Sequence, residues 1–123
     1  MGVPKELGKT WKKKLDTLCR EVIMARDKTC QWPGCGKIEG RQWAHVRSRR
    51  YLSSRWDTRN SMALCAGHHL EWHHRPLRAV EWFQAVHPDR ARAVLLYDHG
   101  AKGGKIDREA IRLGLEQELA RHE

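Results

Sequence analysis

An α+β fold is predicted for this 123-residue chain by three features of its sequence. Apolar residues recur at helical spacing near the N-terminus and again in the C-terminal part. Between them lies a turn-rich segment with strand character, and it holds paired cysteines and histidines. Because the length suits one domain, we expect a single domain over 1–123, with a core at about 28–76, an N-terminal helix at about 9–26 and C-terminal helices over about 77–122.

The first helix is expected over about residues 9–26. Apolar side chains alternate there with lysines at the spacing of an amphipathic helix. We expect the apolar stripe to pack on the cysteine-containing core. Cys19 stands apart from the paired cysteines and is expected to be a buried helix thiol. The stripe consists of Trp11, Leu15, Leu18, Cys19, Val22 and Ile23.

Turn signals dominate the following segment. A Trp-Pro-Gly sequence at 32–34 and a Glu-Gly sequence at 39–40 predict a knuckle followed by a β-hairpin. Residues 42–46 would be the second strand of that hairpin. Residues 47–60 show no sustained period, so we expect a loop over the functional face.

Helices are predicted through most of the remaining chain. Pro88 suits a helix start, and Asp107 can cap the last helix. Ile106 and Ile111 flank that cap at the spacing of a hydrophobic staple. The glycine-rich residues 100–105 predict a flexible connector. The expected helices span 66–75, which Pro76 stops, 77–86, 88–97 and about 107–122.

The paired cysteines predict a zinc site. A tetrahedral site needs four soft or borderline ligands from two chain segments, and a Cys-x4-Cys pair followed by Cys-x2-His supplies them. In a reducing compartment this spacing favours a metal over two disulfides. His68 or His69 can be the fourth ligand, and the two-residue gap after Cys65 favours His68. The expected ligands are Cys30, Cys35, Cys65 and His68.

The charge of the chain favours a polyanionic partner. It carries 24 Lys and Arg against 15 Asp and Glu, a formal net charge of +9, which makes nucleic acid the leading candidate. No stretch approaches the roughly 20 apolar residues of a membrane span. Residues 1–14 are polar and lysine-rich, unlike a signal peptide. We expect a cytoplasmic protein with no membrane partner.

Three further histidines are candidates for catalysis. A neutral imidazole, with a free pKa of about 6.5, can take a proton from water at cellular pH, so His45 fits a general base. The alternative is a histidine that only packs in the hairpin. His69 and His73 are four residues apart, so they share a helix face and can hold one catalytic divalent ion. That ion can be Mg²⁺, Mn²⁺, Ni²⁺ or Zn²⁺; the alternative is a polar cluster that includes His74.

Arginines crowd the segment after His45. Their planar, permanently charged groups suit phosphate oxygens, and such contacts weaken at high salt. The alternative is a solvated charge run. The tryptophans are expected to pack in the core, with Trp56 the one to test for DNA contact. The expected DNA-binding residues are Arg47, Arg49, Arg50, Arg55 and Arg59.

Several motifs follow one another in a characteristic order. They are Cys30-x4-Cys35, Ala44-His45-Val46-x-Ser48-Arg49, Arg55-Trp56-Asp57-x-x-Asn60, Leu64-Cys65-x-x-His68-His69 and His74-Arg75-Pro76-Leu77. Together they resemble the HNH endonucleases, whose core is a ββα-metal fold. Within that superfamily the chain looks closest to phage recombination-associated nucleases. The resemblance covers roughly residues 10–85.

This resemblance implies a small zinc-stapled ββα-metal core in a DNA endonuclease that hydrolyses phosphodiester bonds with a second divalent ion. The implied setting is phage recombination or DNA processing in a bacterial cytoplasm, with DNA and recombination proteins as partners. The family pattern also favours His68 as the fourth zinc ligand. Asn60 would orient the loop and the base-bearing strand through its amide. The implied catalytic residues are His45, Asn60, His69 and His73, of which His69 and His73 hold the catalytic ion.

Ala44 departs from the family pattern. Many members carry Asp or His there as a metal ligand, and an alanine side chain cannot ligate. The ion would then rest on two histidines, water and phosphate, which we favour. Alternatively His45 turns to the ion and His74 acts as base, or the domain only binds DNA. A non-catalytic zinc-dependent DNA-binding module and a structural zinc adaptor are therefore the competing functions.

Overall fold

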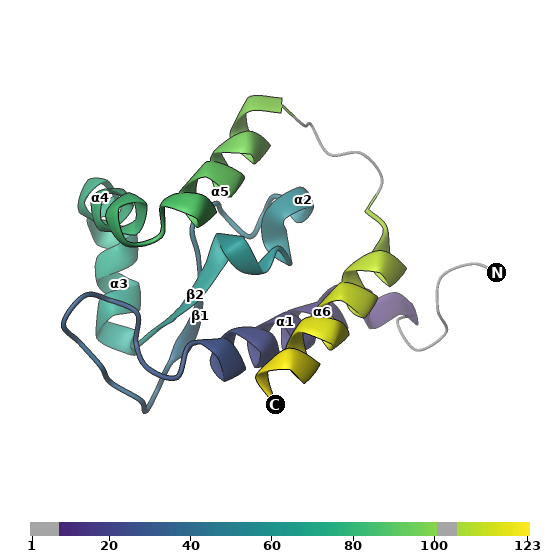
Figure 1. Cartoon of the computed structure of the whole chain (residues 1–123). Coiled ribbons are helices and arrows are strands. Elements are labelled where there is room, and N and C mark those ends of the chain that lie inside the picture. The colour runs from purple at the N-terminus through teal and green to yellow at the C-terminus, as the bar shows by residue number, and fades with distance from the viewer. Residues whose placement is uncertain (1–7, 101–105) are drawn as a thin grey trace.

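Helices and a small two-stranded sheet make up the chain, which confirms the expected α+β class (Figure 1). The computed structural model describes residues 8–100 and 106–123. Its elements are η1 (Gly8–Thr10), α1 (Trp11–Arg26), β1 (Gln42–His45), α2 (Leu52–Arg55), η2 (Thr58–Asn60), β2 (Ser61–Leu64), α3 (Ala66–His74), α4 (Pro76–Val86), α5 (Pro88–Gly100) and α6 (Arg108–His122).

The sheet corrects the expected β-hairpin. β1 pairs antiparallel with β2, in the register that sets Gln42 opposite Leu64 and His45 opposite Ser61. β1 is therefore the first strand, and the arginine-rich segment connects it to its partner. Among the described residues, no strand lies between Cys30 and β1. Gly36 and Gly40, with φ of 72° and 70°, place turns there instead.

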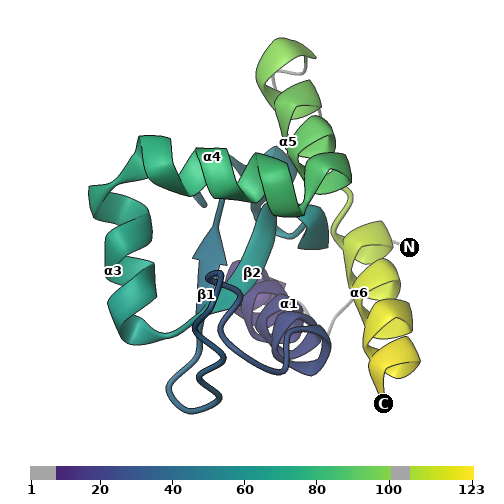
Figure 2. The ribbon, with the colours of Figure 1, turned by 60° about the vertical axis from the view of Figure 1, so that its left-hand side comes forward.

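Two apolar cores lie on opposite faces of the sheet, because successive side chains of β2 alternate. Ala63 joins a first core with the α1 stripe, Trp56 and Leu115 of α6. Met62 and Leu64 join a second core with Cys30, Cys65, Ala44, Trp72, Ala79 and Phe83. In Figures 1 and 2, α1 and α6 lie toward one side of the strands and α3 and α4 toward the other.

The expectation that the α1 stripe packs on the cysteine core was therefore wrong. The stripe packs on the face of Ala63 and on α6, away from the cysteine pairs. Helical periodicity shows which face of a helix is apolar, but the surface it meets depends on distant residues. Cys19 is a buried helix thiol, as predicted, and burial raises its pKa to about 12.

The helix boundaries agree with the sequence in most places. α5 begins at Pro88, and Asp107 caps α6 by accepting a hydrogen bond from the Ala110 amide at 3.0 Å. α4 already starts at Pro76, which occupies its first turn, while α5 extends to Gly100. Of the expected connector, 101–105 lie outside the described residues.

A buried ion pair fixes the end of α1 to the sheet. Arg26 donates to both carboxylate oxygens of Asp27, at 2.8 and 3.0 Å, and also to the Thr58 and Ser61 carbonyls. Asp27 in turn accepts from the Ala63 amide at 3.1 Å. These contacts hold β2 against the helix and so fix the strand that precedes α3. None of the described helices combines the length and apolarity needed to cross a membrane.

Candidate functional site

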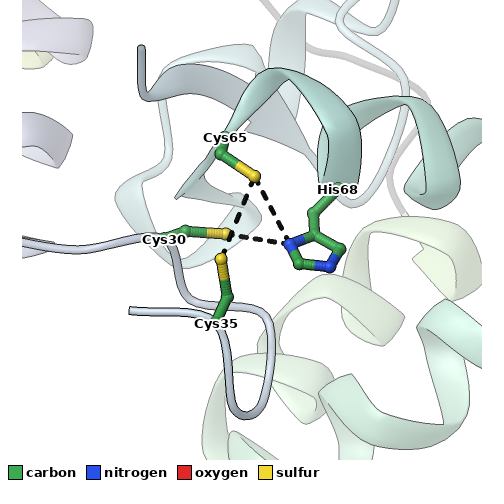
Figure 3. Close-up of side chains that lie close together, drawn as sticks. All are labelled: Cys30, Cys35, Cys65 and His68. Carbon is green, nitrogen blue, oxygen red and sulfur yellow. Dashed lines mark hydrogen bonds between the residues drawn. The ribbon is translucent and has the colours of Figure 1, made fainter. Parts of the chain in front are cut away.

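Three cysteines and one histidine converge as the sequence predicts (Figure 3). His68 Nδ1 lies 3.6 Å from Cys30 Sγ and 3.4 Å from Cys65 Sγ, and Cys35 Sγ lies 4.0 Å from Cys65 Sγ. Tetrahedral zinc with ordinary bond lengths requires edges of about 3.6 Å between sulfur and nitrogen and about 3.8 Å between sulfurs. All four cysteines of the chain are free of disulfides. The cluster can therefore hold a metal ion.

The knuckle that carries Cys30 and Cys35 is shaped by its backbone. Gly34 has a φ of 83°, which a side chain at that position would oppose. The Cys30 amide donates to the Lys37 carbonyl at 2.6 Å, which closes the turn. The Trp32 ring stacks on the His68 ring at 4.8 Å, with planes 5° apart. This stacking holds the imidazole in the orientation that presents Nδ1 to the sulfurs.

A cavity of about 450 Å³ lies where β1 meets α3 and α4, and α3 also carries His68 of the cluster. All three predicted catalytic histidines line the cavity, together with one of the predicted arginines, Arg49. The cavity residues are Trp43, His45, Val46, Ser48, Arg49, His69, Trp72, His73, Pro76, Ala79 and Val80. Histidines from a strand and a helix thus face a common space large enough for a phosphate group.

His45 is held as a neutral imidazole. The residue is 9% exposed, and its Nε2 lies 3.1 Å from the Arg55 carbonyl oxygen. A carbonyl only accepts, so Nε2 carries the proton and Nδ1 keeps a free lone pair. Burial lowers the pKa of His45 to about 4, so the ring is uncharged at neutral pH. Trp72 fixes the strand beneath it by donating to the His45 carbonyl at 2.8 Å.

His69 and His73 stand one turn apart on α3, with ring centroids 4.9 Å apart. Nδ1 of His69 lies 2.7 Å from Oε1 of Gln42, a residue that the sequence did not single out. Burial, followed by the nearby His73, lowers the pKa of His69.

His74 is exposed and does not line the cavity. Within 8–100 and 106–123, the Cys3His cluster is the one group of three or more potential ligands that converges closely.

Asn60 is fully buried and holds the loop instead of lining the cavity. Its Oδ1 accepts from the Arg47 amide at 2.7 Å, and its Nδ2 donates to the Arg47 and Ser54 carbonyls at 3.0 and 3.1 Å. Ala44 is also fully buried, in the second core. That position therefore offers no ligand to the cavity.

The five arginines differ in how far their charge is already paired. Arg55 makes two hydrogen bonds to Asp16, and Arg59 makes two to Asp57. Arg47 lies 4.0 Å above the Tyr51 ring and donates to the Ser54 hydroxyl.

Arg49 and Arg50 are both exposed, and Arg49 is the one of the five arginines that lines the cavity. Arg49 is 57% exposed, pairs with Asp16 at 3.1 Å and lines the cavity, while Arg50 is exposed beside Tyr51.

Trp56 is buried and donates to Asp16 at 2.8 Å, so it packs in the core. Burial raises the pKa of Asp16, but hydrogen bonds from Arg55 and Trp56 outweigh it and keep that pKa below its usual value.

Comparisons of the chain with protein-family models, with curated proteins and with solved structures found no match. What defines the protein is therefore its own geometry: an α+β chain with a Cys3His cluster and, on the same helix α3, two of the three histidines that line a cavity. The sequence offered no indication of the roles of Gln42 and Asp16. Each forms its hydrogen bond with a residue far away along the chain.

Proposed function

We propose that this chain is a metal-dependent DNA endonuclease of the HNH type. The observation that carries the proposal is the shared cavity of His45, His69, His73 and Arg49, in a chain that also holds a Cys3His cluster. A base, a pair of ion ligands and a phosphate-binding cation are the groups that phosphodiester hydrolysis requires. The sequence order β1, β2, α3 also matches the ββα arrangement of that superfamily.

Two ions have separate roles in this proposal. Zn²⁺ on the Cys3His cluster ties the knuckle to the start of α3 and stabilises the fold. His69 and His73 would hold a second divalent ion, Mg²⁺, Mn²⁺, Ni²⁺ or Zn²⁺. That ion, when bound, neutralises charge on the scissile phosphate and on the departing oxygen. Phosphate and water would complete its coordination, because the side chain of Ala44 supplies no ligand.

His45 would activate the attacking water through Nδ1. The water oxygen forms a bond to phosphorus, its proton passes to Nδ1, and the bond from phosphorus to the departing sugar oxygen breaks. The departing oxygen takes a proton from solvent. A pKa of about 4 keeps Nδ1 unprotonated at neutral pH, and a bound phosphate raises that pKa by favouring the imidazolium. Arg49 would hold the phosphate, and Asn60 fixes the loop that aims His45.

The test is nicking of supercoiled plasmid by the zinc-loaded chain with EDTA or with added Mg²⁺, Mn²⁺, Ni²⁺ or Zn²⁺. We expect metal-dependent nicking that His45→Ala abolishes without loss of folding or DNA binding. His74→Ala, a change to an exposed histidine outside the cavity, is the matched control and should cut normally. Equal activity of His45→Ala and the unsubstituted chain would refute the catalytic assignment.

The burial of Ala44 favours a second candidate, a non-catalytic zinc-dependent DNA-binding module. That function predicts salt-sensitive DNA binding and no nicking with any of the four ions. For either function we propose a setting in phage recombination or DNA processing, in a bacterial cytoplasm with recombination proteins as partners. Absence of salt-sensitive DNA binding would exclude both functions and favour a structural zinc adaptor.

A further inference from the structure

His69 follows directly on the Cys3His cluster in α3, yet its ring is aimed by a different element. Cys65 and His68 place the first turn of the helix at the cluster. The His69 imidazole instead reaches Gln42, the first residue of β1, across 27 positions of the sequence. Pairing of β1 with β2 makes this contact, since Gln42 stands opposite Leu64, just before α3 begins.

The contact with Gln42 determines which ring nitrogen of His69 carries the proton. Oε1 of an amide only accepts hydrogen bonds, so at 2.7 Å Nδ1 must carry the proton. Nε2 then keeps its lone pair, which is the form of imidazole that binds a metal ion. The nearby His73 ring, with its centroid 4.9 Å away, lies within reach of the same ion.

We propose that Gln42 is a positioning residue that holds His69 as the Nδ1-protonated tautomer and so presents Nε2 to a divalent ion in the cavity. The inference rests on the proposed function, whose second ion it concerns. Such partners behind a ligating histidine fix the ring and raise its basicity, and their loss weakens metal binding by about 10- to 100-fold. Gln42 is not one of the four residues of the Cys3His cluster, so replacing it leaves all four of those ligands in place.

Two measurements on the full chain loaded with one equivalent of Zn²⁺ test this role. Long-range ¹H–¹⁵N correlation spectra identify the protonated nitrogen of His69 without any second ion. Calorimetric titration with Mn²⁺ then measures the second site, because Mn²⁺ is among the weakest competitors for the zinc ligands. Gln42→Ala is the test variant. Gln42→Glu restores an acceptor, and Gln84→Ala changes an exposed amide on α4 as the matched control.

We expect Nδ1 protonation of His69 in the unsubstituted chain and its loss in Gln42→Ala, with Mn²⁺ binding about 10- to 100-fold weaker. Gln42→Glu should recover both properties, Gln84→Ala should change neither, and all variants should keep one zinc. Protonation at Nε2 in the unsubstituted chain, or equal Mn²⁺ affinity in Gln42→Ala, would overturn the role of Gln42 while leaving the cavity as the ion site. If the unsubstituted chain binds no Mn²⁺, the catalytic ion of the proposed function is itself refuted, and the role of Gln42 with it.

Discussion

Replacing Asn60 with alanine removes three hydrogen bonds from the inside of the loop that joins β1 to β2. The Arg47 amide, the Arg47 carbonyl and the Ser54 carbonyl each lose their partner. A buried polar group left unpaired costs about 1–3 kcal/mol. Because the loop is near the surface, water that hydrates the freed backbone groups offsets part of this cost. We expect Asn60→Ala to lower the free energy of unfolding by about 3 kcal/mol, a large share of the 5–15 kcal/mol typical of a domain.

Urea unfolding of the zinc-saturated chain, followed by tryptophan fluorescence, measures that loss. Asn60→Asp keeps the acceptor for the Arg47 amide but sets an oxygen against two carbonyls, so it should destabilise at least as much as alanine. The control Gln84→Ala, at an exposed helix position, should stay within about 0.5 kcal/mol. A loss below about 1 kcal/mol for Asn60→Ala would refute the view that this amide holds the loop.

Three further changes test the remaining parts of the site. Cys65→Ser removes a thiolate from the cluster, so elemental analysis should show loss of zinc and circular dichroism an unfolded chain; a folded variant with full zinc would contradict this. Arg55→Ala strips Asp16 of its main partner and should cost about 2 kcal/mol in urea unfolding. Because the pKa of Asp16 is lowered, the difference should be full above pH about 4 and vanish as the pH falls through that depressed pKa; a constant difference would contradict it. Arg50→Ala should leave stability unchanged but weaken DNA binding and reduce the slope of log K against log salt by about 0.9, as titrations at several salt concentrations would show.

Local signals in the sequence predicted most helices and the metal cluster. The Asp107 cap and the Pro88 start depend on a few adjacent residues, so they are visible in sequence order. The spacing of Cys65 and His68 fixes two ligands on one helical turn, and the knuckle supplies the other two. These features need no knowledge of which distant segments meet.

The rest depends on pairing between distant segments. All four residues of β2 are buried, so the strand lacks the alternation that would indicate it, and its partner lies beyond a long loop. For the same reason the sequence did not show which core receives the α1 stripe. Asp16 contacts Arg55 over 39 positions and Gln42 contacts His69 over 27, so neither role is visible before the fold is known.

We propose that two ions occupy separate sites, one structural and one at the cavity. The most direct measurement is anomalous scattering at the zinc and manganese edges from crystals of the zinc-loaded chain soaked in Mn²⁺. We predict a zinc peak within the Cys3His cluster and a manganese peak between the Nε2 atoms of His69 and His73. A single zinc peak, with no manganese at the cavity in soaked crystals, would contradict the assignment of two ion sites.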